Sequence, residues 1–144
     1  MAAAAWVFYN KAKEYMGDGT IDLDTDVFRL ALFTSASNAA TATLSTYASL
    51  TNQVASANGY ALLGKSVVQT WATGASASEI RWDATAVIWT AAGGSISAVK
   101  YGVVHETGDG KILCYSTLST AQFSITDTNT LTVTPSANGI FELN

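Results

Sequence analysis

Two runs of alternating residues on either side of a glycine pair place the strongest constraint on how this chain can fold. They lie in EIRWDATAVIWTAAGGSISAVKYGVVHE, residues 79–106, and residues 91–94 separate them. Both runs are rich in β-branched and aromatic residues, and their side chains alternate with the period of two that is typical of β-strands. Because turn residues lie between the runs, the pattern predicts paired strands, with Trp82 and Trp89 anchoring the core.

Similar runs, separated by turn residues, predict further strands along the chain. In one of them Phe28, Leu30 and Leu32 share a face that we expect to be fully buried. The run that follows the Asn-Gly turn reads as one long strand with a kink or bulge at Gly64. The predicted strands are residues 27–34, 60–72, 99–105, 111–118, 122–126, 130–134 and 140–143.

Two turns are expected to join neighbouring antiparallel strands. Asp109-Gly110 is among the strongest hairpin signals and predicts that the strands flanking it pair with each other. Residues 127–129 separate the runs 122–126 and 130–134, which we also expect to pair.

The long polar segment between the first two strands indicates a crossover connection. Residues 35–58 are small and low in charge, with helix-like spacing that favours one helical turn near residues 46–51. Long connections of this kind are typical of Greek-key and jelly-roll folds. We therefore predict an all-β protein, with residues 17–144 forming one Greek-key or jelly-roll-like antiparallel β-sandwich of about eight strands.

The first sixteen residues, MAAAAWVFYNKAKEYM, form a separate N-terminal segment by composition. Their Ala, Lys and Glu content favours a short helix over residues 7–15, and an extended arm is the alternative. Trp6, Phe8 and Tyr9 place much apolar surface near the terminus. These side chains either cover the domain's own core or form an arm that docks on a neighbouring subunit, and both interpretations stay open.

Large aromatic side chains in predicted strands are expected to be core residues first and ligand platforms second. Cys114, the only cysteine, alternates with apolar neighbours and is expected to be a small buried hydrophobe rather than a reactive thiol. The predicted core anchors are Phe28, Leu30, Leu32, Trp71, Trp82 and Trp89.

The charge of the chain limits its partners. The net charge is −4, and the seven cations are dispersed, which argues against binding to nucleic acid or to an anionic membrane. Charged residues make up 12% of the chain, about half of the usual ~25%, so its surface is suited to packing against other subunits. Without a basic leader or a run of ~18 apolar residues, we expect cytoplasmic synthesis and no membrane span.

One acidic motif is a weak candidate for a metal site. Asp22, Asp24 and Asp26 have the D-x-D-x-D spacing of calcium loops, in which alternate residues direct oxygens at one cation. An EF-hand loop continues with Gly and has Glu at its twelfth position, whereas here Val27 and Phe33 stand there. The alternative is a solvated strand face that carries the three aspartates.

Candidates for catalysis are equally weak. His105, the only histidine, is followed by Glu106, but no G-x-S-x-G motif is present, so we expect an exposed histidine at a strand end. A pair of carboxylates for glycoside hydrolysis would have to come from a few acids, and nothing in the sequence selects two of them. Those acids are Glu79, Asp83, Glu106 and Glu142.

Several stretches resemble, in the same order along the chain, landmarks of small β-sandwich virion proteins of tailed bacteriophages. One departure from the family pattern is Leu63-Gly64, which stands where a Gly-Gly pair is expected and leaves the local bulge geometry open. The stretches are DTDVFRLALF (24–33), NGY (58–60) with GK (64–65), WDA (82–84) with VIWTA (87–91) and GGSI (93–96), and TVTP (132–135) with NGIF (138–141).

The resemblance implies a structural virion protein without catalysis, cofactor or small-molecule ligand. We expect a capsid decoration or cement protein, made in the host cytoplasm, that binds the major capsid protein and copies of itself as a homotrimer. Residues 1–16 have no clear counterpart in that family, so Trp6, Phe8 and Tyr9 are the expected partner contacts. A tail or head–tail connector component is the alternative within the class, and a carbohydrate- or receptor-binding β-sandwich module is the alternative outside it.

Overall fold

The computed structural model describes residues 4–74 and 76–143 and confirms an all-β fold with one short N-terminal helix. Eleven strands occur among the described residues, several of them very short, against about eight expected. In chain order the elements are β1 (Val7–Phe8), α1 (Asn10–Asp18), β2 (Phe28–Thr34), η1 (Tyr47–Ser49), β3 (Lys65–Val67), β4 (Gln69–Thr73), β5 (Ile80–Ala84), β6 (Val87–Thr90), β7 (Ile96–Glu106), β8 (Ile112–Thr117), β9 (Phe123–Ile125), β10 (Thr130–Val133) and β11 (Phe141–Leu143).

The central sheet holds the chain together. Its strand order is β1-β8-β7-β2-β3, all neighbours are antiparallel, and β9 pairs with the first part of β7. The longest ladder joins β2 to β7 through seven residue pairs, from Phe28 opposite Glu106 to Thr34 opposite Val99. β7 also pairs with β8, which confirms the hairpin predicted from Asp109-Gly110.

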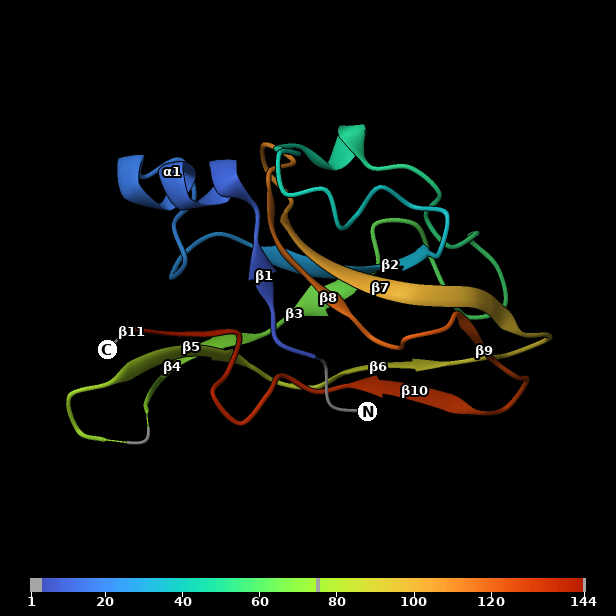
Figure 1. Cartoon of the computed structure of the whole chain (residues 1–144). Coiled ribbons are helices and arrows are strands. Elements are labelled where there is room, and N and C mark those ends of the chain that lie inside the picture. Colours follow the sequence, from blue (N-terminus) through green and yellow to red (C-terminus); the bar gives the residue numbers. More distant parts are fainter. Residues whose placement is uncertain (1–3, 75, 144) are drawn as a thin grey trace.

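Two small sheets form a second layer beneath the central sheet (Figure 1). One has the order β11-β5-β4 and the other pairs β10 with β6, and the two lie end to end in one layer (Figure 1). Leu30 and Val104 of the central sheet face Val87 and Val133 of this layer around a space of about 10 Å³. A void that small holds at most one water, so the core between the layers is closely packed.

The other face of the central sheet is covered by α1 and by residues 35–62, which contain η1 (Figure 1). The helical turn predicted near residues 46–51 is thereby confirmed. Because both faces of the sheet are covered, consecutive side chains of β2 from Leu30 to Phe33 are all buried. Among the described residues, no helix has both the length and the apolar character needed to cross a membrane.

Two predicted strand pairings are wrong, and both errors have the same cause. β6 pairs with β10 and β7 with strands of the central sheet, so the runs that flank Gly93 do not pair with each other. Likewise β9 pairs with β7, so the runs 122–126 and 130–134 lie in different sheets. At both places the chain crosses between layers, and Asp127 Oδ1 joins the crossings by accepting hydrogen bonds from the backbone N–H of Gly93 (2.8 Å) and Gly94 (3.3 Å).

The single strand predicted over residues 60–72 is also wrong. Residues 61–64 form a turn, closed by a hydrogen bond of 3.1 Å from Gly64 N to Ala61 O. β3 then pairs with β2 in the central sheet, whereas β4 pairs with β5 in the second layer. Val68, between them, marks the residue at which the chain changes sheets.

The turn at residues 61–64 places two consecutive residues in the left-handed region. Gly64 has φ 73°, and a Cβ there would lie 1.8 Å from Leu30 O, so no larger residue fits. Leu63 has φ 69°, a conformation that costs a residue with a Cβ about 1–2 kcal/mol. The Leu63-Gly64 pair therefore adopts a backbone geometry suited to Gly-Gly, and Leu63 is strained in it.

Leu63→Gly is accordingly expected to raise the free energy of unfolding by up to about 1 kcal/mol, because relief of the left-handed strain outweighs the greater chain entropy of glycine. Urea denaturation measures the change. Leu62→Gly is the matched control: Leu62 is similarly exposed, at 55% against 46% for Leu63, but its φ is negative, so this variant should be less stable than the wild type. A Leu63→Gly variant that is no more stable than the wild type would contradict the strain.

Candidate interaction surface

Five of the six predicted core anchors are buried, and the sixth is not. Trp71 is 41% exposed, so its assignment to the core is wrong. It lies opposite the fully buried Trp82, but β4 is the edge strand of its sheet and leaves one side of the indole open to solvent. The expectation for Cys114 is confirmed: its side chain is fully buried, and this burial raises the pKa of the thiol well above its ordinary value. The buried anchors are Phe28, Leu30, Leu32, Trp82 and Trp89.

Trp71 belongs to an apolar sheet face that is only partly covered. In the register of β4, β5 and β11, Trp71 and Phe141 lie opposite Trp82, and Leu143 lies opposite Ile80, so the five side chains share one side of the sheet. Exposure rises along that side from 0% at Trp82 to 43% at Ile80 and 56% at Leu143. We call Trp71, Ile80, Phe141 and Leu143 the apolar face.

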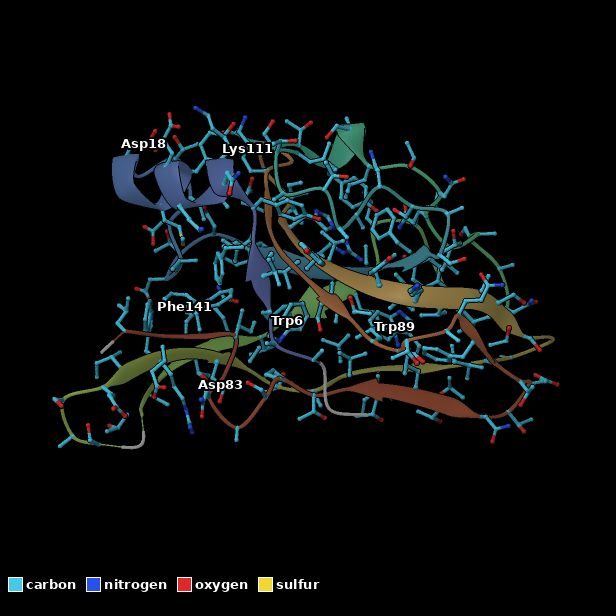
Figure 2. The ribbon with its side chains drawn as sticks, in the orientation of Figure 1. Trp6, Asp18, Asp83, Trp89, Lys111 and Phe141 are labelled. Atoms are coloured by element: carbon cyan, nitrogen blue, oxygen red, sulfur yellow. The ribbon has the colours of Figure 1, made fainter. Side chains whose placement is uncertain are left out.

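An open hollow of about 310 Å³ separates Trp71 from the end of α1 and the turn that follows it. In Figure 2, the label Asp18 marks the end of α1, and the label Phe141 marks the small sheet that carries Trp71. The volume is at the lower end of those that bind a small ligand or a few side chains of a partner. The hollow is lined by Met16, Gly19, Ile21, Asp22, Leu23, Asp24 and Trp71.

Two hydrogen bonds attach the turn on one side of the hollow to the sheet on the other. The indole Nε1 of Trp82 donates to Leu23 O (3.0 Å), and Nε2 of Gln69 donates to Asp26 O (2.8 Å). Trp82 is also packed edge-on against Phe28, with ring centroids 5.2 Å apart. Both walls of the hollow are therefore held at a set separation by the core.

The turn itself is stabilised by its own aspartates. Asp22 Oδ1 accepts a hydrogen bond of 2.9 Å from Asp24 N, and Asp26 Oδ2 accepts one of 2.8 Å from Asp22 N. The hydrogen bond from Asp24 N is the main cause that lowers the pKa of Asp22, and hydrogen bonds from Thr20 lower the pKa of Asp18. Like other exposed aspartates, Asp18 and Asp22 are ionised at neutral pH, so the wall that they border is negatively charged.

The D-x-D-x-D segment is thus a turn, and the expectation of a strand face is wrong. Asp26 N donates to Asp22 O (3.0 Å), which closes the turn. The carboxylates of Asp22 and Asp26 are directed at backbone N–H groups instead of at a common point. Within residues 4–74 and 76–143, no three acidic, histidine or cysteine side chains are grouped so that they could hold a metal ion.

The N-terminal segment is built into the domain. Phe8 of β1 pairs with Cys114 of β8, so the chain joins the central sheet before α1 begins. Tyr9 is fully buried and donates a hydrogen bond to Ala39 O, while Trp6 and Phe8 are partly buried against the core. Of the two interpretations left open, the described residues 4–16 follow the one in which the aromatic side chains cover the domain's own core, and Tyr9 is not available to a partner. Residues 1–3 of the predicted arm lie outside the described part of the chain.

His105 is buried, which contradicts the prediction of an exposed histidine. It is 2% exposed because the ring of Tyr47, in η1, stacks on it with centroids 4.1 Å apart. Its Nε2 lies 3.0 Å from Leu63 O, and because a carbonyl oxygen can only accept, Nε2 carries the hydrogen and Nδ1 does not. Burial is the main cause that lowers the pKa of His105, and the nearby charge of Arg29 lowers it further, so the ring is neutral at pH 7.

Glu106 does not form a catalytic pair with its neighbour His105. Consecutive strand residues point to opposite faces, and the carboxylate of Glu106 accepts hydrogen bonds from the backbone N–H groups of Gly108 and Asp109 in the adjoining hairpin. Its role is to hold that turn. The other acids considered for catalysis, Glu79, Asp83 and Glu142, are partly exposed in or next to β5 and β11.

Lowering the pH from about 7.5 to 5.5 is expected to destabilise the protein through His105. As the pH falls below about 6.5, the unfolded chain binds a proton that the folded state, with its lowered pKa, does not bind. The free energy of unfolding should then fall by at most about 1.4 kcal/mol per pH unit, the limit for one proton. Urea denaturation across this range measures the slope.

His105→Gln is the matched variant for this measurement, because its side-chain amide keeps an N–H donor for Leu63 O and does not titrate. The slope should be lost in His105→Gln. Equal slopes in the two proteins would assign the pH dependence to other groups.

The apolar face is the feature that sequence reasoning missed. A tryptophan in a strand is usually buried, so Trp71 and Trp82 look alike in the sequence. The sequence feature that could have indicated exposure is position along the strand. Ile80 and Leu143 lie at the ends of their runs, where a neighbouring layer is least able to cover them. Exposure depends on how far one layer extends past the other.

Comparisons with known proteins assign no family. The chain matches no family model, and searches of curated proteins and of solved structures return no match. Inferences about function therefore rest on the geometry and on the resemblance of the sequence stretches.

Proposed function

We propose that the chain is a structural subunit of a tailed-bacteriophage particle, of the capsid decoration or cement type, and that it has no catalytic role. In this proposal it is made in the host cytoplasm, binds the lattice of the major capsid protein, contacts copies of itself as a homotrimer, and stabilises the head. The role requires a folded domain with a surface that other subunits cover.

The stretches that resemble phage virion proteins support this proposal by where they fall. Residues 24–33 include most of β2, the centre of the main sheet, and residues 58–65 contain the strained turn into β3. Residues 82–96 include most of β5, all of β6 and the crossing between layers, and residues 132–141 lead from β10 to β11. The resemblance thus extends over both layers of the sandwich.

The observation that carries the proposal is the partly uncovered apolar face. Trp71, Ile80 and Leu143 expose about half of their surface on one side of one sheet, and clustered exposure of this kind marks an interaction surface. With 12% charged residues, the chain has few charges to keep neighbouring molecules apart. Both features suit a subunit that is covered in an assembly.

The test is to purify particles of the phage that encodes this chain and to quantify their proteins by mass spectrometry. We expect the chain in heads, at a constant ratio to the major capsid protein. Recombinant protein should co-sediment with heads from which the native copies were removed, and should raise the temperature at which those heads release DNA. Absence from purified particles would contradict the proposal, and presence in tails alone would replace the capsid role with that of a tail component.

A carbohydrate-binding module is a second candidate, and the exposure of Trp71 favours it. An indole face open to a hollow can stack on a sugar ring, and the carboxylate of Asp24 in the lining can accept hydrogen bonds from hydroxyls. A glycan array followed by calorimetry on any hit tests this function. We expect Trp71→Ala to weaken such binding at least about tenfold. An array without hits would exclude this candidate for the glycans it displays.

A further inference from the structure

We infer that the hollow beside Trp71 is a docking site for a partner segment whose apolar side chains are flanked by lysine or arginine. The inference rests on the proposed structural function and deepens it, because it names the surface and the chemistry of the partner. Three arguments support it. One wall of the hollow is apolar and rigid, and the opposite wall is acidic. Repulsion between two acidic walls also disfavours a second copy of the chain as the occupant of the hollow.

The apolar wall is preorganised. The ring of Trp71 packs edge-on against Phe141, with centroids 6.1 Å apart, and Phe141 in turn packs against the buried Trp82 at 6.0 Å. A tryptophan that is already held in place loses little freedom on binding, which is typical of residues that dominate interface energies. Ile80 and Leu143 extend the same surface toward solvent.

The opposite wall is predominantly acidic. Between Lys13 and Arg29 every charged residue is an aspartate or glutamate, and none of the residues that line the hollow is basic. Asp18 and Asp22 are exposed and ionised at neutral pH, as aspartates ordinarily are, and hydrogen bonds from Thr20 and from Asp24 N lower their pKa values further. Among the described residues, no hydrogen bond engages the carboxylate of Asp24. The acidic residues are Asp18, Asp22, Asp24 and Asp26, together with Glu14, which forms an ion pair with Lys11.

This distribution of charge selects among possible occupants. A second copy of the chain in a two-fold contact through the hollow would bring two acidic turns together, so local repulsion disfavours that occupant here, and the contacts of the proposed homotrimer would lie elsewhere on the surface. A neutral sugar needs several convergent polar groups, whereas Met16, Ile21, Leu23 and Trp71 make most of the lining apolar. A cationic and apolar segment is complementary to both walls.

The test uses the full-length chain, labelled with ¹⁵N, and three synthetic octapeptides that share the centre Val-Leu-Phe-Val. Two arginines flank that centre on each side in the first peptide, two glutamates in the second and two serines in the third. We expect the arginine peptide to bind with amide shifts confined to the turn near Asp22, to β4 and to the ends of β5 and β11. Binding should weaken in about 0.5 M NaCl, and the glutamate peptide should not bind.

Variants locate the site. Trp71→Ala should weaken the arginine peptide at least about tenfold. If Trp71→Ala alters the fold, Leu143→Ala tests the apolar face independently. The double variant Asp22→Asn, Asp24→Asn should weaken binding severalfold, and its amide oxygen at residue 22 can still accept the hydrogen bond that holds the turn. Ile88→Ala is the matched control, because Ile88 is 48% exposed on the other small sheet and should have no effect.

Several results would overturn the inference: no binding of the arginine peptide, equal binding of the glutamate peptide, or shifts centred on β6 and β10. A glycan that binds through Trp71 when the arginine peptide does not would also overturn it. Sedimentation with phage heads separates this inference from the proposed function. Heads that retain Trp71→Ala as well as the wild type would refute the docking site alone, and peptide binding by a protein that never sediments with heads would refute the capsid role alone.

Discussion

The seven-pair ladder between β2 and β7 is the interaction on which the rest of the structure depends. β8 folds back on β7, β3 adds to the free edge of β2, and both covering layers pack on the surface that this ladder creates. Within it, Arg29 lies opposite His105, and the two side chains hold the strained turn by donating to Gly64 O (2.8 Å) and Leu63 O (3.0 Å). Buried polar groups are costly unless they are hydrogen-bonded, so each of these contacts stabilises the ladder as well as the turn.

The candidate interaction surface follows from this core through Trp82. Its ring packs against Phe28 of β2, and its Nε1 donates to Leu23 O in the acidic turn. One buried side chain thus sets the position of the apolar face relative to the acidic wall. Beyond Trp82 the second layer continues past its cover, and the side chains that would be core in a longer central sheet become an exposed surface at Trp71, Ile80 and Leu143.

Much of the fold could be predicted from local pattern. Alternation located most of the strands, the Asp-Gly turn identified the β7–β8 hairpin, and composition indicated the helical turn at η1. The errors share one cause: a turn between two strands does not reveal whether the chain folds back in the same sheet or crosses to the other layer. Gly93 and Asp127 lie at such crossings, and the hydrogen bond between them forms only when both layers are in place.

The sequence by itself determined most of the residues that are in strands, which side chains alternate, and the low, acidic charge of the chain, because these properties depend on neighbours along the chain. Tertiary structure alone decided the burial of His105 beneath Tyr47, the incorporation of Tyr9 into the core and the exposure of Trp71. Burial depends on how far one layer extends over another, and the local sequence pattern does not predict that distance. The two tryptophans of one cross-strand pair therefore have opposite roles, Trp82 in the core and Trp71 at the surface.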